Sequence, residues 1–185
     1  MPGPGGTGFR SLGERTLYEG SVISLAIGTF EAPDGHRFER EIVHHPGAVS
    51  VVALHDDGRV VLLRQFRAPL GRELLEIPAG KRDVEGEPPE VTARRELEEE
   101  TGLRAGSLEK LVTFHNSVGF CDEHSHVFLA RGLEQVAVDR QGVEERHMTI
   151  ELVALDEALA MIDAGAITDA KTVIGLTLAA RRLGR

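Results

Sequence analysis

The sequence contains a single cysteine, Cys121, and it has no run of basic residues and no long apolar run. One cysteine excludes an intramolecular disulfide, which suits a reducing compartment, and we expect a cytoplasmic protein. No apolar stretch approaches the roughly 20 residues that span a membrane. The first ten residues also lack the apolar core of a signal peptide. The absence of basic runs, with a net charge of −9, argues against a nucleic-acid polymer or an anionic membrane as the main partner.

What is present is an ordinary globular chain of 185 residues, 41% of them hydrophobic and 28% charged. This length fits one main domain with a small appendage. We expect residues 1–15 to form a flexible tail, residues 16–46 a small β unit and residues 47–185 the main domain. The β unit contains a hairpin signal, Asp34-Gly35. Because a few strands bury little surface alone, this unit should pack on the main domain or on a second subunit.

The main domain alternates between strand-like and helix-like segments. Apolar and β-branched runs predict strands at 48–54, 59–67, 73–80, 108–117, 125–133 and 149–155. Two closing helices are expected at 156–165 and 169–183, with Asp156 and Thr168 as their N-caps. Strands interleaved with helices indicate an α/β fold, in which a mixed sheet carries helices on both faces.

One stretch organises the rest, and it reads GKRDVEGEPPEVTARRELEEETGL. Its second half predicts a helix of three to four turns. Pro88 and Pro89 suit the first helical turn, where a missing N–H is not needed. Ala93 and Leu97 stand four residues apart and mark a buried stripe. Gly102 is a typical residue for ending the helix.

The acidic residues of this helix need an explanation. The last two turns, where the helix dipole disfavours negative charge, contain Glu96, Glu98, Glu99 and Glu100. Spacing allows Arg94 to pair with Glu98 and Arg95 with Glu99. Glu96 and Glu100 stand four residues apart and have no basic residue one turn earlier. The sequence leaves two interpretations open: a solvated acidic face, or a set of oxygen ligands for a divalent cation such as Mg²⁺ or Mn²⁺.

The stretch resembles the Nudix box, in which a glycine, five residues, a glutamate and seven residues precede R-E-aliphatic-x-E-E-x-G-aliphatic. The matching residues are Gly80, Glu87, Arg95, Glu96, Leu97, Glu99, Glu100, Gly102 and Leu103. One departure is that six residues, not five, separate Gly80 from Glu87. The extra residue falls in the loop Lys81–Gly86, ahead of the helix, so we expect the ligand geometry to survive. The resemblance implies a Nudix α/β/α sandwich, preceded here by the small N-terminal β unit.

A wider region, from about residue 47 to 155, is similar to the ADP-ribose pyrophosphatase branch of this family. The supporting segments are Arg64–Arg67, the run LLEIPAG and Val118–Glu123, although Val118 replaces a proline and Cys121 a hydroxyl residue. The resemblance implies metal-dependent hydrolysis of ADP-ribose to AMP and ribose 5-phosphate. The alternatives are a pyrophosphatase for another nucleoside diphosphate sugar, such as GDP-mannose, and a non-catalytic nucleotide-sugar sensor. Sensors of this kind usually lose acids from the box, whereas every acid is present here.

The resemblance also implies roles for individual residues. Glu96 and Glu100, with Glu99 and the carbonyl of Ala79, are the expected ligands of Mg²⁺ or Mn²⁺. Arg95 is expected to orient Glu99 as part of the catalytic set. The remaining box positions, Gly80 for close backbone approach, Glu87 for bracing the loop and Gly102 for ending the helix, are expected to be structural.

A general base must deprotonate the attacking water. By resemblance it comes from a mobile loop, where Glu145 matches best and Glu144 is second; either can equally be a solvated loop acid. The expected substrate-binding residues are Arg40, Arg67, Glu76, Gly119, Phe120 and Glu123. On the sequence alone, Arg67 is as well explained as a surface cation, Arg40 as an ion-pair partner on a facing strand, and Phe120 or Phe38 as core. The resemblance finally implies a homodimer with exchanged N-terminal strands and a small nucleoside diphosphate sugar as the substrate.

Overall fold

The computed structural model describes residues 8–137 and 147–185, which form two compact units. Unit 1 comprises the described residues up to Gly47 together with His115–His124. Unit 2 comprises Ala48–Phe114 and the described residues from Ser125 onward. In the described parts of the chain, no helix is both long and apolar enough to cross a membrane.

Unit 1 is built on an antiparallel sheet of three strands. These are β1 (Arg10–Glu19), β2 (Ser24–Glu31) and β3 (Arg37–His44), in that order. The predicted hairpin lies between β2 and β3, where Gly35 has a φ of 85° and the N–H of His36 donates to Asp34. Strand β1 begins inside the stretch expected to be a flexible tail. All ten of its residues are exposed, so the strand has no buried apolar face that the sequence could reveal.

In its described residues, unit 2 contains two sheets, three α-helices and a short 3₁₀ helix (Ala68–Leu70). Its strands are β4 (Ala48–Ala53), β5 (Arg59–Arg67), β6 (Arg72–Glu76), β7 (Ala79–Lys81), β8 (Leu103–His115), β9 (His124–Gln135) and β10 (Thr149–Ala154). Its helices are α1 (Pro89–Thr101), α3 (Leu155–Asp163) and α4 (Ala170–Arg182). One sheet has the order β10-β5-β6 and is antiparallel; the other has the order β7-β4-β9-β8 and is mixed, because β4 pairs antiparallel with β7 and parallel with β9.

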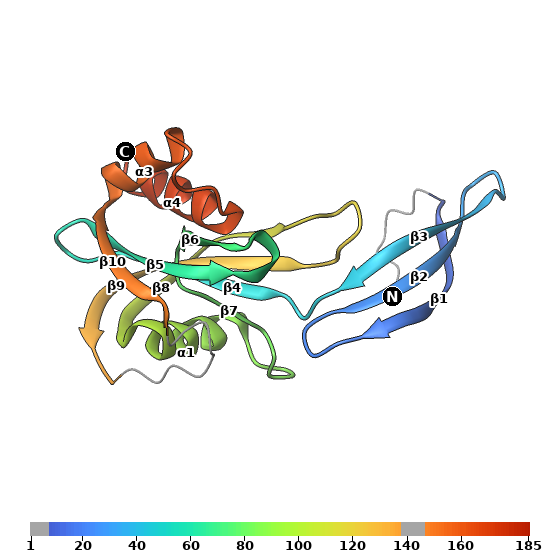
Figure 1. The fold of residues 1–185 in the computed structure, drawn as a ribbon, viewed down its shortest axis with the longest axis horizontal. Coiled ribbons are helices and arrows are strands. Elements are labelled where there is room, and N and C mark those ends of the chain that lie inside the picture. The colour runs from blue at the N-terminus through green and yellow to red at the C-terminus, as the bar shows by residue number, and fades with distance from the viewer. Residues whose placement is uncertain (1–7, 138–146) are drawn as a thin grey trace. The chain divides into compact units, whose positions relative to one another are not determined.

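Strand β4 shows how the core forms on both sides of the mixed sheet. Val49 and Val51 are buried in a cluster that includes Leu97 of α1. Val52, on the opposite face of the strand, is buried in a cluster that includes Leu176 of α4. Figure 1 shows α1 on one side of these strands and α3 with α4 on the other. The predicted α/β/α arrangement with a mixed sheet is therefore confirmed.

The predicted strand 73–80 is in fact two strands in different sheets. It breaks after Glu76, because Pro78 has no N–H to donate to a neighbouring strand. The carbonyl of Pro78 instead accepts a hydrogen bond from the N–H of Val51 at 2.9 Å. The break turns the chain toward α1, and Ala79 and Gly80 follow directly after it.

Both predicted N-caps of the closing helices are wrong. Helix α3 has Ala154 at its N-cap, with no side-chain hydrogen bond there. Asp156 lies in the first turn, where the helix dipole stabilises a negative charge. Helix α4 is capped by Asp169 and not by Thr168. The Asp169 carboxylate accepts the backbone N–H of Thr172 at 3.0 Å, which is the usual bond of an N-cap acid.

Candidate active site

Helix α1 is held in one rotational position by its apolar stripe. Ala93 and Leu97 are both fully buried, as their spacing predicted, and Gly102 ends the helix in the left-handed conformation, with a φ of 68°. With the stripe facing the sheet, Glu96 lies against the backbone of Gly80. A Cβ atom at Gly80 would lie 1.9 Å from the Glu96 carboxyl carbon, so any other residue here would displace this carboxylate from its position. The Glu96 side chain thus approaches the Gly80 backbone closely.

The environment of Glu96 disfavours its negative charge. The side chain is 14% exposed. Burial raises the pKa of Glu96 to about 7, against the opposing charge of Arg95 and with the negative charge of Glu99 adding to the rise. A divalent cation beside this carboxylate would compensate for the lost hydration, because it favours the ionised form.

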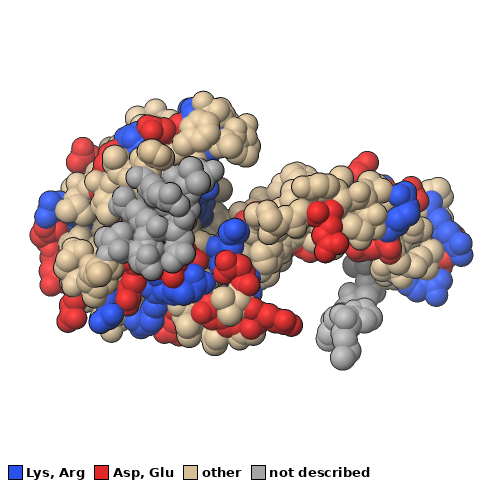
Figure 2. All heavy atoms as spheres, turned by 60° about the horizontal axis from the view of Figure 1, so that its bottom comes forward, with Lys and Arg blue, Asp and Glu red and all other residues tan. Residues whose placement is uncertain are grey.

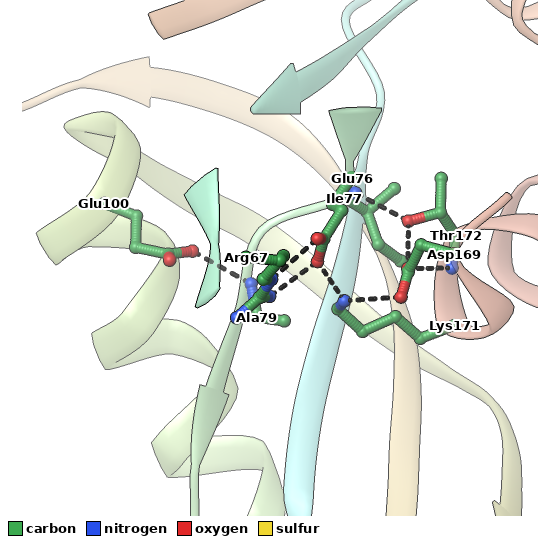
Figure 3. Close-up of polar contacts among 8 residues, drawn as sticks. All are labelled: Arg67, Glu76, Ile77, Ala79, Glu100, Asp169, Lys171 and Thr172. Carbon is green, nitrogen blue, oxygen red and sulfur yellow. Dashed lines mark hydrogen bonds and ion pairs between the residues drawn. The ribbon is translucent and has the colours of Figure 1, made fainter. Parts of the chain in front are cut away.

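Glu100, one turn after Glu96, is directed at the same segment of backbone. It is 4% exposed, and its Oε2 accepts a hydrogen bond from the N–H of Ala79 at 2.9 Å (Figure 3). Both acids of the i,i+4 pair therefore contact the segment 79–80 from one face of α1. A fully solvated acidic face, the simpler interpretation of the sequence, does not describe this pair.

Arg95 gathers four carboxylates around its guanidinium group. Its Nη1 donates to Glu96 at 3.0 Å and to Glu99 at 3.2 Å. Its Nη2 donates to Glu87 at 3.3 Å and to Asp83 at 3.4 Å. These contacts are those of a residue that orients Glu99 and braces the preceding loop. The extra residue in that loop leaves Glu87 within reach of the helix.

The predicted ion pair between Arg94 and Glu98 is wrong. Arg104, from strand β8, donates to both carboxylate oxygens of Glu98, at 2.9 and 3.1 Å, and lowers the pKa of Glu98. Arg94 instead donates to the carbonyl of Ala105 at 2.7 Å. The pair predicted from helical spacing is replaced because the turn at Gly102 brings the next strand back beside the helix.

Arg67 and Glu76 form an ion pair across adjacent strands. Arg67 donates to both oxygens of Glu76, at 2.7 and 2.6 Å, and Lys171 of α4 bonds the same carboxylate (Figure 3). Glu76 is fully buried, whereas the Arg67 side chain is 40% exposed. Burial alone would raise the pKa of Glu76, but Arg67 and Lys171 outweigh it and hold that pKa below its usual value. Asp169 in turn pairs with Lys171, so two carboxylates balance the two cations of this group.

In unit 1, Arg40 stacks on an aromatic ring. Its guanidinium carbon lies 4.6 Å from the ring centroid of Phe38, and its Nη1 donates to the carbonyl of Glu39. Within the described residues Arg40 forms no ion pair, because the residue paired with it across the strands is Gly28. Phe38 itself packs against Phe30 and a second phenylalanine, so it belongs to an aromatic cluster.

The segment that contains Gly119, Phe120 and Glu123 pairs with strand β3 of unit 1. The N–H of Val43 donates to the carbonyl of Phe120 at 2.8 Å. The Phe120 side chain is 56% exposed and is therefore not core. Glu123 lies 3.9 Å from the Nδ1 atom of His45, a distance that allows attraction but no hydrogen bond.

His44 joins this segment to the first strand. Its Nδ1 lies 2.6 Å from a carboxylate oxygen of Asp122, and its Nε2 lies 2.8 Å from one of Glu14 in β1. The hydrogen bond with Asp122, followed by that with Glu14, raises the pKa of His44. The predicted base candidates Glu144 and Glu145 lie outside the described residues.

The donor atoms around α1 suit a hard divalent cation. Glu96, Glu99, Glu100 and the backbone carbonyl of Ala79 offer only oxygen, which is the ligand type that Mg²⁺ and Mn²⁺ prefer. The space at Gly80 and the raised pKa of Glu96 fit the same ion. In the described parts of the chain, no three acidic, histidine or cysteine side chains already converge in the geometry of a metal site.

Sequence reasoning missed three residues that the structure brings to these networks. Asp83 reaches Arg95 from the loop that carries the extra residue. Lys171, in the first turn of α4, contacts the Glu76 carboxylate, and Asp169, the N-cap of that helix, lies 3.0 Å from Lys171 Nζ through its Oδ1. The only signal in the sequence was the N-cap preference of Asp169, which the neighbouring Thr168 shares.

Comparisons with known proteins identify the family. A NUDIX domain profile matches residues 44–174. An ADP-ribose pyrophosphatase from Bacillus subtilis (strain 168) is 43% identical over 173 residues, which cover 91% of this chain and 93% of that protein. A methanol dehydrogenase activator from Bacillus methanolicus is 42% identical over 86% of each chain. A crystal structure of an ADP compounds hydrolase superposes with a TM-score of 0.83 at 20% identity, covering 95% of this chain and 94% of that one, and so shares the fold. The chain belongs to the Nudix family.

Proposed function

We propose that the protein hydrolyses the pyrophosphate bond of ADP-ribose, so that ADP-ribose and water give AMP and ribose 5-phosphate. The observation that carries the proposal is the pair of carboxylates, Glu96 and Glu100, directed at the segment 79–80 in a chain of the Nudix family. The choice of substrate is supported by the B. subtilis relative, which is named for this activity and is similar over 91% of the chain.

Nudix hydrolases use divalent metal ions, and we propose Mg²⁺ or Mn²⁺ for this protein. Glu96, Glu99, Glu100 and the carbonyl of Ala79 would hold the ion. When bound, such an ion neutralises phosphate oxygens and lowers the pKa of a water ligand. Arg95 keeps the carboxylates of Glu96 and Glu99 close together, because one of its nitrogens donates to both.

The remaining roles are proposed as follows. Glu145, or Glu144 beside it, takes the proton from the attacking water. Arg67 binds a substrate phosphate, which is supported by the partial exposure of its guanidinium side chain beside the buried Glu76. Arg40, Gly119, Phe120 and Glu123 complete the binding of the nucleotide sugar.

Product analysis tests the reaction directly. Purified protein is incubated with ADP-ribose and Mg²⁺, or with ADP-ribose and Mn²⁺, and the products are separated by chromatography. AMP and ribose 5-phosphate are expected in equal amounts. If neither metal supports AMP release, the proposal is wrong.

Glu100→Gln tests the metal ligand. We expect kcat to fall by far more than tenfold, and a tenfold loss already corresponds to about 1.4 kcal/mol in the barrier. Glu98→Gln is the matched control, because Glu98 lies on the same helix but pairs with Arg104 at the surface. A Glu100→Gln enzyme that stays within about tenfold of the wild type would disprove the ligand role.

A second candidate function, regulation of a dehydrogenase, is favoured by the 42% identity with the methanol dehydrogenase activator. The face in Figure 2 shows Lys and Arg lying among Asp and Glu without a continuous basic surface, which suits a small ligand in either case. A hydrolysis panel that includes GDP-mannose separates the candidate substrates. Activation of a methanol dehydrogenase without hydrolysis of any nucleotide sugar would favour the second function.

The N-terminal sheet is proposed to form a homodimer by exchange between two subunits. Strand β1 is exposed along its whole length and carries exposed apolar side chains, among them Leu12, Leu17 and Tyr18. A three-stranded sheet with so much apolar surface in water is expected to be covered by a partner. Light scattering during gel filtration should give about twice the chain mass of 20.1 kDa. A mass equal to one chain would exclude the dimer.

A further inference from the structure

The junction between β6 and β7 is fixed by hydrogen bonds to two helices. Pro78 has no N–H, so the three residues Ile77, Pro78 and Ala79 have two backbone donors. The N–H of Ala79 donates to Glu100 in α1 at 2.9 Å. The N–H of Ile77 donates to the Thr172 hydroxyl in α4, also at 2.9 Å, and Figure 3 shows both bonds. The carbonyl of Ala79, proposed above as a metal ligand, is therefore oriented from both sides.

The Thr172 hydroxyl has a single possible orientation in this arrangement. Its proton is donated to the Asp169 carboxylate, at an oxygen–oxygen distance of 2.6 Å. Because a hydroxyl has one proton, a lone pair must face Ile77, whose N–H is directed at it. Thr172 is fully buried, so water cannot take its place. Asp169 is itself fixed, because it also accepts the backbone N–H of Thr172 and pairs with Lys171.

Helix α4 also packs closely against the side chain of Ile77. Gly175, one turn after Thr172, lies so close that an added Cβ atom would be 3.0 Å from the Ile77 Cδ1 atom and from a methyl group of Val52. Ile77 is fully buried. Its backbone N–H and its side chain are thus both held by α4, two residues before Ala79.

We propose that Thr172 is a positioning residue for the metal centre. Its hydroxyl fixes the Ile77–Ala79 backbone, so that the Ala79 carbonyl and the Gly80 backbone face Glu96 and Glu100. The inference rests on the proposed function, because it takes Ala79 as a metal ligand. It assigns part of the metal affinity to a residue of the C-terminal helix, 95 positions away from Ile77. Groups that orient metal ligands typically change metal affinity or activity by about 10–100-fold when they are removed.

The test measures Mn²⁺ binding without substrate, by electron paramagnetic resonance of the free ion. Thr172→Val keeps the shape of the side chain but removes the acceptor for Ile77. We expect its Kd for Mn²⁺ to rise about tenfold or more. Thr172→Ser keeps the hydroxyl and should restore the Kd to within about twofold of the wild type. Thermal unfolding followed by circular dichroism establishes that each variant is folded at the temperature of the measurement.

Several outcomes would overturn the inference. They are a folded Thr172→Val protein with the wild-type Kd, and a Thr172→Ser protein that binds as weakly as Thr172→Val. If Thr172→Val does not fold, Thr172→Ala takes its place, because it also removes the acceptor for Ile77 but puts no γ-methyl group beside that N–H. Unchanged Mn²⁺ binding by Thr172→Ala then refutes the inference.

The result is separable from the choice of substrate. A wild-type protein that binds Mn²⁺ but releases no AMP from ADP-ribose contradicts the proposed reaction and leaves the role of Thr172 intact. A wild-type protein that binds no Mn²⁺ contradicts both. Normal hydrolysis by the wild type, with no difference between the valine and serine variants, contradicts the positioning role alone.

Discussion

Without metal, Glu96 is predicted to destabilise the folded protein at neutral pH. Its folded-state pKa of about 7 lies above the value of 4.5 for a free glutamate, chiefly because the side chain is buried. The folded state therefore binds the proton more tightly than the unfolded state. By linkage, the penalty is absent below pH 4.5, grows as the pH rises and is complete above pH 7. At about 1.4 kcal/mol for each pKa unit, the full penalty is about 3 kcal/mol.

Glu96→Gln replaces the carboxylate by a neutral group of the same shape. It also loses the ionic attraction to Arg95, although Arg95 keeps its ion pairs with Glu99, Glu87 and Asp83. Allowing for that loss, we expect the free energy of unfolding to rise by about 2 kcal/mol at pH 8 in EDTA. The gain should fall toward zero by pH 5. Urea unfolding at both pH values measures the difference.

Glu98→Gln is the control for this prediction. Glu98 lies two residues away on the same helix, but its pKa is lowered by Arg104, so its replacement should give no gain at pH 8. Excess Mg²⁺ should reverse the order of wild type and Glu96→Gln, because only the wild type retains the full ligand set. The reasoning fails if Glu96→Gln is no more stable than the wild type in EDTA at pH 8, or if its gain is the same at pH 5.

Two further predictions concern Gly80, beside Glu96, and His44 of unit 1. Gly80→Ala would place a Cβ atom 1.9 Å from the Glu96 carboxyl carbon and force that side chain to move. We therefore expect Mn²⁺ binding and kcat to fall by at least about tenfold. Binding and rates close to the wild type would show that Glu96 can move without losing its role. His44 stabilises the fold mainly when it is protonated between Asp122 and Glu14, and its folded-state pKa is raised above 6.5. Its contribution is therefore complete below pH 6.5 and is lost as the pH rises through the folded-state pKa. The difference in Tm between wild type and His44→Gln should shrink between pH 6 and pH 9, and a constant difference would contradict this assignment.

The helix of the Nudix box could be predicted because its signals are local. The two prolines, the apolar stripe and the final glycine agree on one helix, and α1 runs from Pro89 to Thr101. Once the stripe fixes its rotation, the i,i+4 spacing places Glu96 and Glu100 on one face. The sequence therefore predicts that these acids share one face of the helix, but it does not predict that they contact the backbone segment 79–80.

The remaining contacts could not be predicted because they join distant parts of the chain. Lys171 bonds Glu76 across 95 positions, and no periodicity links the two residues. Local rules also offered two adjacent N-caps for α4. Asp169 is the cap because its carboxylate binds the hydroxyl of Thr172 as well as the Lys171 ammonium, contacts that exist only in the folded chain.

The chain passes from one unit to the other three times, after Gly47, after Phe114 and after His124. The sheet of unit 1 is therefore completed by a segment that comes from the middle of the sequence, where Phe120 accepts a hydrogen bond from Val43. A fragment cut at residue 47 would lack this segment together with Asp122, one of the two carboxylates that bind His44. The amino-terminal sheet is thus not a portable module: grafting it onto another protein would require the loop between β8 and β9 to be transferred with it.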